Sequence, residues 1–233
     1  MVPRETFNKL DESKKARILD AAVSEFALHG FRQASVNRLV DRIGIAKGSL
    51  FQYFGSKEGL FQVIFNHAVE LVRQSLRQVK HETSGTDFFE RIRESTLAGI
   101  RFINSHPRIY RIYLKMIFQE DFPLRAEFLE KVHLFSAEYL RPIVEAGISR
   151  GELRQDLDLE MAVFMLDALM DRFLQAYCVP FLDAGAQIYQ ASDPELERKV
   201  TEFVKILRLG MGVPTLQPRG QTRLAGEAID GNV

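Results

Sequence analysis

The sequence predicts an all-α fold. Apolar residues recur at helical spacing along most of the chain, and no convincing period-two alternation or Asn-Gly turn predicts a strand or a hairpin. The 233 residues, 46% hydrophobic and 27% charged, have a globular composition and are enough to bury a sizeable core. We therefore expect about nine helices, arranged as a three-helix front domain and a larger helical body.

The first predicted helix covers about residues 12–28 and ends at Gly30, which suits a left-handed conformation at a helix end. Its apolar stripe follows the spacing i, i+3, i+4, i+7 in Leu19, Ala22, Val23 and Phe26. Ser35 can cap a second helix, about 36–43, through its hydroxyl. The third helix, about 47–53, follows a tight turn that contains glycine. Two short helices joined in this way form a helix-turn-helix pattern.

Six longer helices are predicted after these three, at about residues 57–80, 87–104, 106–118, 123–149, 159–179 and 193–210. Pro107 is tolerated in the first turn of its helix, whereas Pro142 falls inside one and should kink it. The last helix begins with a capping box from Ser192 to Glu195. The chain thus divides into a helix-turn-helix domain, a helical body and a tail that we expect to be disordered, with the ranges 1–56, 57–211 and 212–233.

The charges are unevenly placed. Lys and Arg match Asp and Glu over the whole chain, with 31 of each, but residues 1–57 carry a net charge of +4, which leaves −4 for the rest. Because binding to nucleic acid is largely neutralisation of phosphate by Lys and Arg, this asymmetry favours a front domain that touches DNA. The excess of four charges is modest.

Other classes of protein are disfavoured. Cys178 is the only cysteine, which excludes an internal disulfide and a multi-cysteine zinc site. No apolar run approaches the roughly 18 residues of a membrane span, and the N-terminus lacks the apolar stretch of a signal peptide. Glu130 and His133 form half of a di-iron carboxylate motif without the other half, and no catalytic loop motif is present. We expect a cytoplasmic protein with no enzymatic activity, metal or cofactor.

The predicted helix 47–53 carries an unusual outward face. Leu50 and Phe54 share the inner side, and the other side chains point outward. The outward residues offer a cation for phosphate, a glycine that admits close backbone approach, a glutamine that can pair adenine, and two aromatic rings: Lys47, Gly48, Ser49, Phe51, Gln52 and Tyr53. Short helical pairs also occur in purely structural roles, so the pattern alone leaves DNA binding and a structural role open.

Residues 17–64 resemble the N-terminal domain of the tetracycline-repressor (TetR) family of bacterial transcription regulators. The matching positions are Arg17, Ile18, Leu19, Ala21, Ala22, Phe26, Gly30, Phe31, Ser35, Val36, Leu39, Val40, Gly44, Ile45, Ala46, Lys47, Gly48, Ser49, Leu50, Tyr53, Phe54, Ser56, Lys57, Glu58 and Leu60. The resemblance implies a homodimeric repressor that binds a palindromic operator and releases it when a small molecule enters the helical body.

The resemblance also implies DNA contacts residue by residue. The six outward residues from Lys47 to Tyr53 match the recognition helix, and Ser35 and Asn37 match contacts at the start of the preceding helix. Lys57 begins the next helix, where its charge and the free N–H groups favour a phosphate. Phe51 replaces the tyrosine that is usual in the family, which loses a hydroxyl but keeps apolar contact with a thymine methyl.

Two predicted helices of the body, 159–179 and 193–210, correspond to the pair that forms a four-helix dimer interface in the resembled family. The first is apolar on more than one side and the second on one stripe. The interface residues implied are Phe164, Asp167, Asp171, Leu174, Val200, Phe203, Val204 and Leu207. The alternative is that both helices line the core of a monomer.

A largely apolar effector pocket is expected in the body. The candidate lining residues are large and adaptable: Phe102, Tyr110, Tyr113, Met116, Phe118, Phe135, Tyr139, Phe164, Met165 and Phe173. They supply an ordinary core equally well. Arg101 and Arg111 are candidates to meet an anionic effector, whereas Asp167 and Asp171 are candidates to meet a cation, and all four are also candidates for ion pairs.

Two further hypotheses concern function. Because the helix 57–80 spans both units, an effector that displaces it would change the spacing of the two recognition helices. The alternative to a DNA-binding regulator is an accessory protein on the same fold, whose front domain contacts other proteins.

Overall fold

The computed structural model describes residues 5–118, 122 and 125–213, and the side chains of all of these except 133–137. The described part contains ten α-helices, one 3₁₀ helix and no strand, which confirms the all-α prediction. The two elements beyond the nine expected are short, namely α1 (Glu5–Asn8) and η1 (Pro180–Leu182). None of the described helices is long and apolar enough to cross a membrane.

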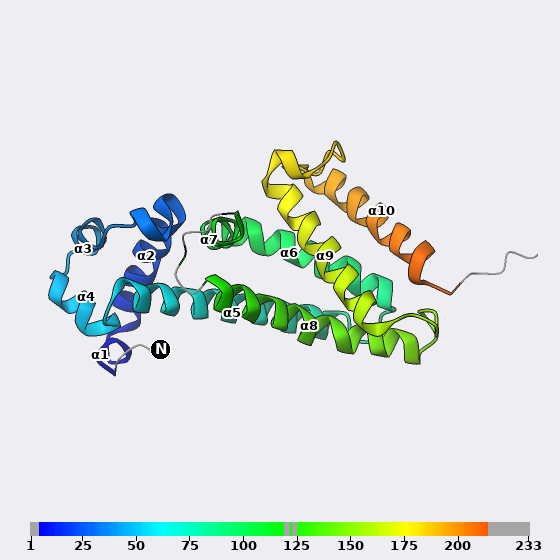
Figure 1. Cartoon of the computed structure of the whole chain (residues 1–233), viewed down its shortest axis with the longest axis horizontal. Coiled ribbons are helices and arrows are strands. Elements are labelled where there is room, and N and C mark those ends of the chain that lie inside the picture. Colours follow the sequence, from blue (N-terminus) through cyan, green and yellow to red (C-terminus); the bar gives the residue numbers. More distant parts are fainter. Residues whose placement is uncertain (1–4, 119–121, 123–124, 214–233) are drawn as a thin grey trace, which may run out of the picture.

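Three helices form one end of the molecule, at the left of Figure 1: α2 (Glu12–Gln33), α3 (Val36–Ile43) and α4 (Lys47–Phe54). Helix α2 changes direction at Gly30, whose φ of 68° is the expected left-handed value. The non-helical backbone at Gly30 breaks the helix there, as the sequence predicts, and a short helical segment follows to Gln33. In that segment Phe31 is buried and stacks on Phe26 with ring centroids 5.9 Å apart.

The predicted caps of this end are present. The Ser35 hydroxyl accepts a hydrogen bond from the backbone N–H of Arg38, and Gly44 ends α3 in the left-handed region. The Ser56 hydroxyl accepts from the N–H of Gly59 at the start of the next helix. These bonds satisfy N–H groups that a helix start otherwise leaves unpaired, so each short helix has a defined boundary.

The body contains six long helices: α5 (Lys57–Glu82), α6 (Phe88–Ser105), α7 (Pro107–Phe118), α8 (Arg125–Ser149), α9 (Leu159–Cys178) and α10 (Asp193–Met211). Figure 1 shows α5 running from the α4 end along the body, with α10 farthest from α3 and α4. Pro107 opens α7 as expected, Pro142 lies inside α8, and the capping box of α10 is formed.

Two apolar cores hold the chain together. The first joins α2, α3, α4 and the start of α5, and it also takes in Ile112 and Met116 of α7 and Phe128 of α8. The second lies among α6, α8, α9 and α10. The first core therefore crosses the division expected between residues 56 and 57, and it joins the front helices to the body by apolar packing.

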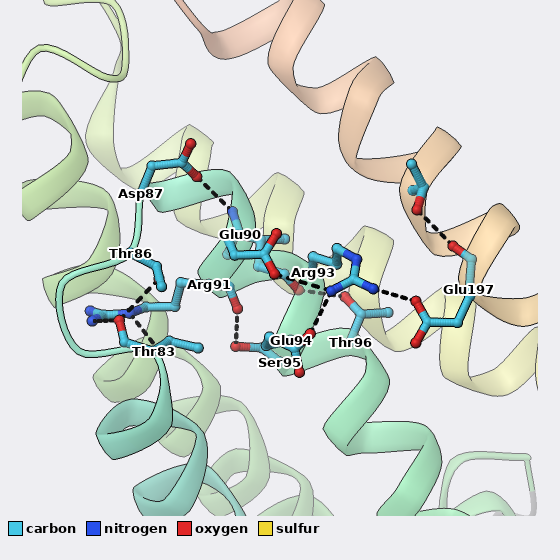
Figure 2. A network of polar contacts seen from close by, with 12 residues as sticks. Thr83, Thr86, Asp87, Glu90, Arg91, Arg93, Glu94, Ser95, Thr96 and Glu197 are labelled. Carbon is cyan, nitrogen blue, oxygen red and sulfur yellow. Dashed lines mark hydrogen bonds and ion pairs between the residues drawn. The ribbon is translucent and has the colours of Figure 1, made fainter.

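A polar network fixes α10 on α6 (Figure 2). Arg93 of α6 forms ion pairs with Glu90, Glu94 and Glu197, the last of which belongs to α10. At the other end of α10, Arg208 pairs with Asp87 at 3.0 Å. Because both ends of α10 are tied to α6, one face of α10 is turned inward along its length and the opposite face is left to solvent.

The chain after α10 begins in an ordered position. Gly212 forms an isolated antiparallel bridge with Leu153, and the Arg154 N–H donates to the Met211 carbonyl at 3.1 Å. Residue 212, which the sequence assigns to a disordered tail, is thus held against the body. The rest of the predicted tail, residues 214–233, lies outside the described residues.

Candidate functional site

Helix α4 presents a polar face at the end of the molecule. Leu50 and Phe54 are buried in the first core, as their i, i+4 spacing predicts. Four of the six predicted outward residues are exposed, namely Lys47, Gly48, Phe51 and Gln52. A Cβ atom added at Gly48 would meet nothing within 4 Å, so the backbone there is open to close approach.

The other two predicted residues of α4 are half-buried, namely Ser49 and Tyr53. The Tyr53 ring lies 6.2 Å from the ring of Phe7 in α1. The sequence interpretation missed this cover because α1 is too short to show a helical period. Because Tyr53 is half-buried, only part of its side chain is accessible to a ligand.

The start of α3 depends on a buried carboxylate. Glu25 of α2 accepts the Ser35 N–H at 2.7 Å and forms an ion pair with Arg38 at 2.6 Å. Burial would raise the pKa of Glu25, but the hydrogen bond from Arg38 and that from Ser35 outweigh it, so the pKa lies below its ordinary value. This arrangement orients Ser35 and leaves Asn37 exposed beside α4. Glu25 was missed because nothing in its spacing marks it among other surface acids.

Lys57 does not project its charge from the start of α5 as expected. Its ammonium donates to the carbonyls of Arg32 and Ala34, at 3.3 and 3.2 Å, and lies 4.6 Å from the centre of the Phe31 ring. These contacts hold the end of α2 against α5. In this conformation the side chain thus has a positioning role, and the predicted phosphate contact stays a prediction.

A cavity of about 250 Å³ lies in the body, lined from α5, α6, α7, α8 and α9. Five predicted pocket residues line it: Phe102, Tyr110, Tyr113, Met116 and Tyr139. Four others do not. Phe118, Phe164 and Met165 are exposed on the outer surface, and Phe173 is buried in the second core with its ring 5.4 Å from that of Phe203. Phe135 and His133 lie among the side chains that the structure does not describe.

Polar groups gather on one wall of the cavity. Asp171 of α9 accepts a hydrogen bond from the Tyr113 hydroxyl at 2.9 Å and another from the Gln175 amide at 2.6 Å. Tyr110 is 8% exposed, and its hydroxyl is buried without a hydrogen-bond partner. Burial raises the pKa of both tyrosines, and the negative charge of Asp171 raises it further. Asp167 lines the same cavity.

Helix α7 joins the cavity to the front helices. Its residues Tyr110, Tyr113 and Met116 line the cavity. Arg108, on the same helix, forms an ion pair with Asp20 of α2 at 2.6 Å and donates to the Ser24 hydroxyl. The sequence interpretation placed the connection between the two units in α5 alone, and no motif pointed to Arg108.

The expected dimer face is partly wrong. Val200, Val204 and Leu207 are buried in the second core of their own chain, and Phe203 is partly buried there. Asp167, Asp171 and Leu174 line the cavity. Only Phe164, which is 65% exposed, faces outward among the predicted residues. The stripe of α10 was assigned to the wrong surface because apolar spacing shows that a face is buried but does not show against what.

A different apolar row is exposed. Its members are Met161, Phe164, Met165 and Leu169 on α9, and Ile206 and Leu209 on α10. Ile206 and Leu209 are 68% and 80% exposed. We call these six residues the α9–α10 row. Large exposed apolar side chains are typical of surfaces that another molecule covers.

Two family profiles match the chain. Residues 18–64 match the profile for bacterial regulatory proteins of the tetR family, and residues 86–212 match the profile for the tetracyclin repressor-like C-terminal domain. The chain belongs to the TetR family. It is a helix-turn-helix, DNA-binding transcriptional regulator, as the resemblance of residues 17–64 predicts. Among the described residues of this TetR protein, no group of three or more His, Cys, Asp or Glu side chains is placed to hold a metal ion.

Individual TetR relatives are distant in sequence. The probable acrEF/envCD operon repressor of Escherichia coli K12 is 24% identical over 203 residues, which are 83% of this chain and 89% of that protein. The crystal structure of a TetR family transcriptional regulator from Chloroflexus aurantiacus has a TM-score of 0.66 at 30% identity, over 92% of this chain and all of that one. FadR of Bacillus subtilis, in complex with stearoyl-CoA, has a TM-score of 0.64 at 19% identity, over 81% and 96% of the two chains, and so shares the fold.

Proposed function

We propose that this TetR protein is a homodimeric repressor that binds a palindromic operator through α4 and releases it when a small molecule enters the cavity. The observation that carries the proposal is the exposed face of α4, with a cation, an open glycine backbone and an amide on one side of a short helix. The E. coli relative bears the name of a repressor, which supports repression over activation.

Each residue of the α4 face has a proposed role. Lys47 pairs with a phosphate, and Gly48 lets the backbone approach the DNA closely. Gln52 reads adenine through two hydrogen bonds, Phe51 contacts a thymine methyl, and Ser49 and Tyr53 donate hydroxyl hydrogen bonds to the DNA backbone. Ser35, the N-cap of α3, and Asn37 in its first turn contact the DNA backbone beside α4. Lys57 acts indirectly by holding α2 against α5.

The α9–α10 row is the proposed dimer interface. One recognition helix reads few base pairs, whereas two helices about 34–36 Å apart read successive major grooves of a palindrome. Covering the row in a dimer removes six large apolar side chains from water, which is the main driving force for association. The row lies far from α4, so both recognition helices stay free in the dimer (Figure 1).

Helix α7 is the proposed route from effector to DNA. A molecule that moves α7 from inside the cavity also moves Arg108, and through it Asp20 and Ser24 of α2. Helix α2 packs on α3, which packs on α4, so a shift of α7 changes the position of α4. The effector can shift the equilibrium between the two positions of α7 only by as much as its binding free energy differs between them.

Selection of bound fragments from sheared genomic DNA tests the function. The full chain is mixed with the fragments at about 0.15 M salt, and a Lys47→Ala, Gln52→Ala double variant serves as the matched control. We expect the wild-type chain to enrich a small number of sites that share a palindrome and the double variant to enrich none. Failure of the folded wild-type chain to enrich any site contradicts DNA regulation and favours a front domain that contacts proteins.

Sedimentation of substituted chains tests the dimer. Phe164→Glu and Ile206→Glu together should convert a dimer to a monomer, because charges would be buried in the α9–α10 row. Phe181→Glu is the control, since Phe181 is 88% exposed but lies in η1 outside that row. A dimer that survives the double substitution contradicts the proposed interface.

A further inference from the structure

Among the described residues that line the cavity, acidic side chains outnumber basic ones. Asp167 and Asp171 lie four residues apart on α9 and line one wall, and Lys131 of α8 also belongs to the lining. The Lys131 ammonium pairs with Glu127 at 2.6 Å, and its side chain is 46% exposed. The described lining thus contains two carboxylates and one lysine, which is half-exposed and already has an acidic partner.

The wall around Asp171 is also aromatic. The Tyr110 and Tyr113 rings are 5.5 Å apart, and the Tyr113 hydroxyl donates to Asp171. The bonds from Tyr113 and Gln175 hold the carboxylate in a fixed orientation. A carboxylate next to aromatic rings attracts a cation in two ways. The negative charge of the carboxylate attracts it directly, and the negative faces of the rings attract it as well.

The two arginines that were candidates to meet an anionic effector lie outside the cavity. Arg101 is exposed, pairs with Glu94 at 3.6 Å and does not line the cavity. Arg111 is also exposed and outside the lining. Among the described lining residues there is therefore no arginine, the side chain best suited to hold a carboxylate or phosphate. Of the two effector charges that the sequence left open, the structure favours the positive one.

We propose that the effector is a lipophilic organic cation whose amine or ammonium group lies beside Asp171 and Asp167, against the rings of Tyr113 and Tyr110, and whose hydrocarbon part fills the apolar remainder of the cavity. The inference rests on the proposed function of the cavity as the effector site. It adds the chemical class of the ligand. The apolar remainder is walled by side chains such as Phe65, Val69 and Ile103, which give a hydrocarbon contact without directional demands.

The test compares three probes that each contain a ten-carbon chain and differ in the head group. Decyltrimethylammonium is a cation, decanoate an anion and decanol neutral. Calorimetric titration into the full chain without DNA measures each affinity. We expect the cation to bind at least about ten-fold more tightly than either of the others, because only the cation gains from the carboxylates and the rings.

Two variants locate the charge. Asp171→Asn and Asp167→Asn should each weaken the cation by about ten-fold and leave decanol within about two-fold of its wild-type affinity. The matched control is Asp158→Asn on the same helix, which removes the same charge outside the cavity lining and keeps a residue able to cap α9. Unchanged binding of decanol shows that each variant retains a folded cavity.

Three results would overturn the inference: equal or tighter binding of decanoate, an equal loss for all three probes in the Asp variants, or no binding of any probe. The fragment selection described above does not depend on any of these titrations. The experiments can therefore distinguish an error in the inferred class of effector from an error in the proposed regulation of DNA.

Discussion

Helix α4 presents one face to solvent, whereas the side chains that line the cavity lie between five helices. On α4, exposure follows from position within a single short helix, since Leu50 and Phe54 are buried and Phe51 and Gln52 are exposed. In the body, Tyr113 of α7 lines the cavity, while Phe164 of α9 faces outward. On α4 the local helical period determines which residues face solvent, whereas in the body tertiary packing determines which residues line the cavity.

The largest expected effect on stability comes from Gly59 at the start of α5, and Gly48 of α4 provides the contrast. A Cβ atom at Gly59 would collide with the Phe54 carbonyl oxygen, whereas one at Gly48 would meet nothing. Gly59→Ala should therefore lower the free energy of unfolding by about 3 kcal/mol, because a rigid backbone must move. Thermal and urea unfolding of the variant measure the change.

Gly48→Ala is the matched control for this prediction. It should leave stability unchanged or raise it by up to about 1 kcal/mol through helix propensity, and it should weaken DNA binding because a methyl group then separates backbone from phosphate. Equal stability of the two variants would contradict the close approach of α4 and α5.

The next largest expected effect on stability concerns Glu25, the buried carboxylate that orients Ser35 at the start of α3. Because the folded pKa of Glu25 lies below its ordinary value of 4.5, its contribution to stability is fully present above that value and is lost as the pH falls through the folded pKa. Glu25→Gln should cost about 2 kcal/mol at neutral pH and make stability less sensitive to acid below pH 4.5.

Urea unfolding at a series of pH values measures the Glu25 effect. Glu70→Gln is the control, because Glu70 pairs with Arg77 on the surface of α5, and exposed pairs add little to stability. Parallel pH profiles for wild type and Glu25→Gln would show that the buried pair contributes nothing.

Smaller effects on DNA affinity should distinguish a phosphate contact from a base contact on α4. Lys47→Ala should weaken binding to all DNA and reduce the slope of log affinity against log salt by about one. Gln52→Ala should instead cost about 1 to 2 kcal/mol on the selected site and little on random DNA. Binding assays at several salt concentrations distinguish the two, and equal losses of Gln52→Ala on both DNAs would remove its role in reading bases.

The smallest expected effect lies at the cavity. The Tyr110 hydroxyl is buried without a partner, and an unpaired buried donor destabilises a fold. Tyr110→Phe should therefore raise the free energy of unfolding by up to about 1 kcal/mol. Tyr113→Phe should lower it, because that hydroxyl donates to Asp171. Thermal unfolding of both variants measures the difference, and a loss in both would show that Tyr110 has a partner after all.

The sequence predicts the front of this molecule well and the body less well, for a physical reason. Ser35, Gly44 and Ser56 act through bonds to neighbours within a few residues, so their roles can be predicted locally. The partners of Lys57 and Glu25 lie ten to twenty-five residues away, and no period indicates them. In the body, the apolar stripe of α10 was correctly predicted as buried, but its partner surface depends on the packing of α6 and α9.

The most direct test of the account is the footprint and stoichiometry of the protein on the fragment that it selects. A dimeric repressor should give two chains per site and two protected half-sites, about one helical turn or a multiple of it apart, because each α4 of the dimer enters one major groove. A saturated complex that holds a single chain, or one that protects a single half-site, would contradict it.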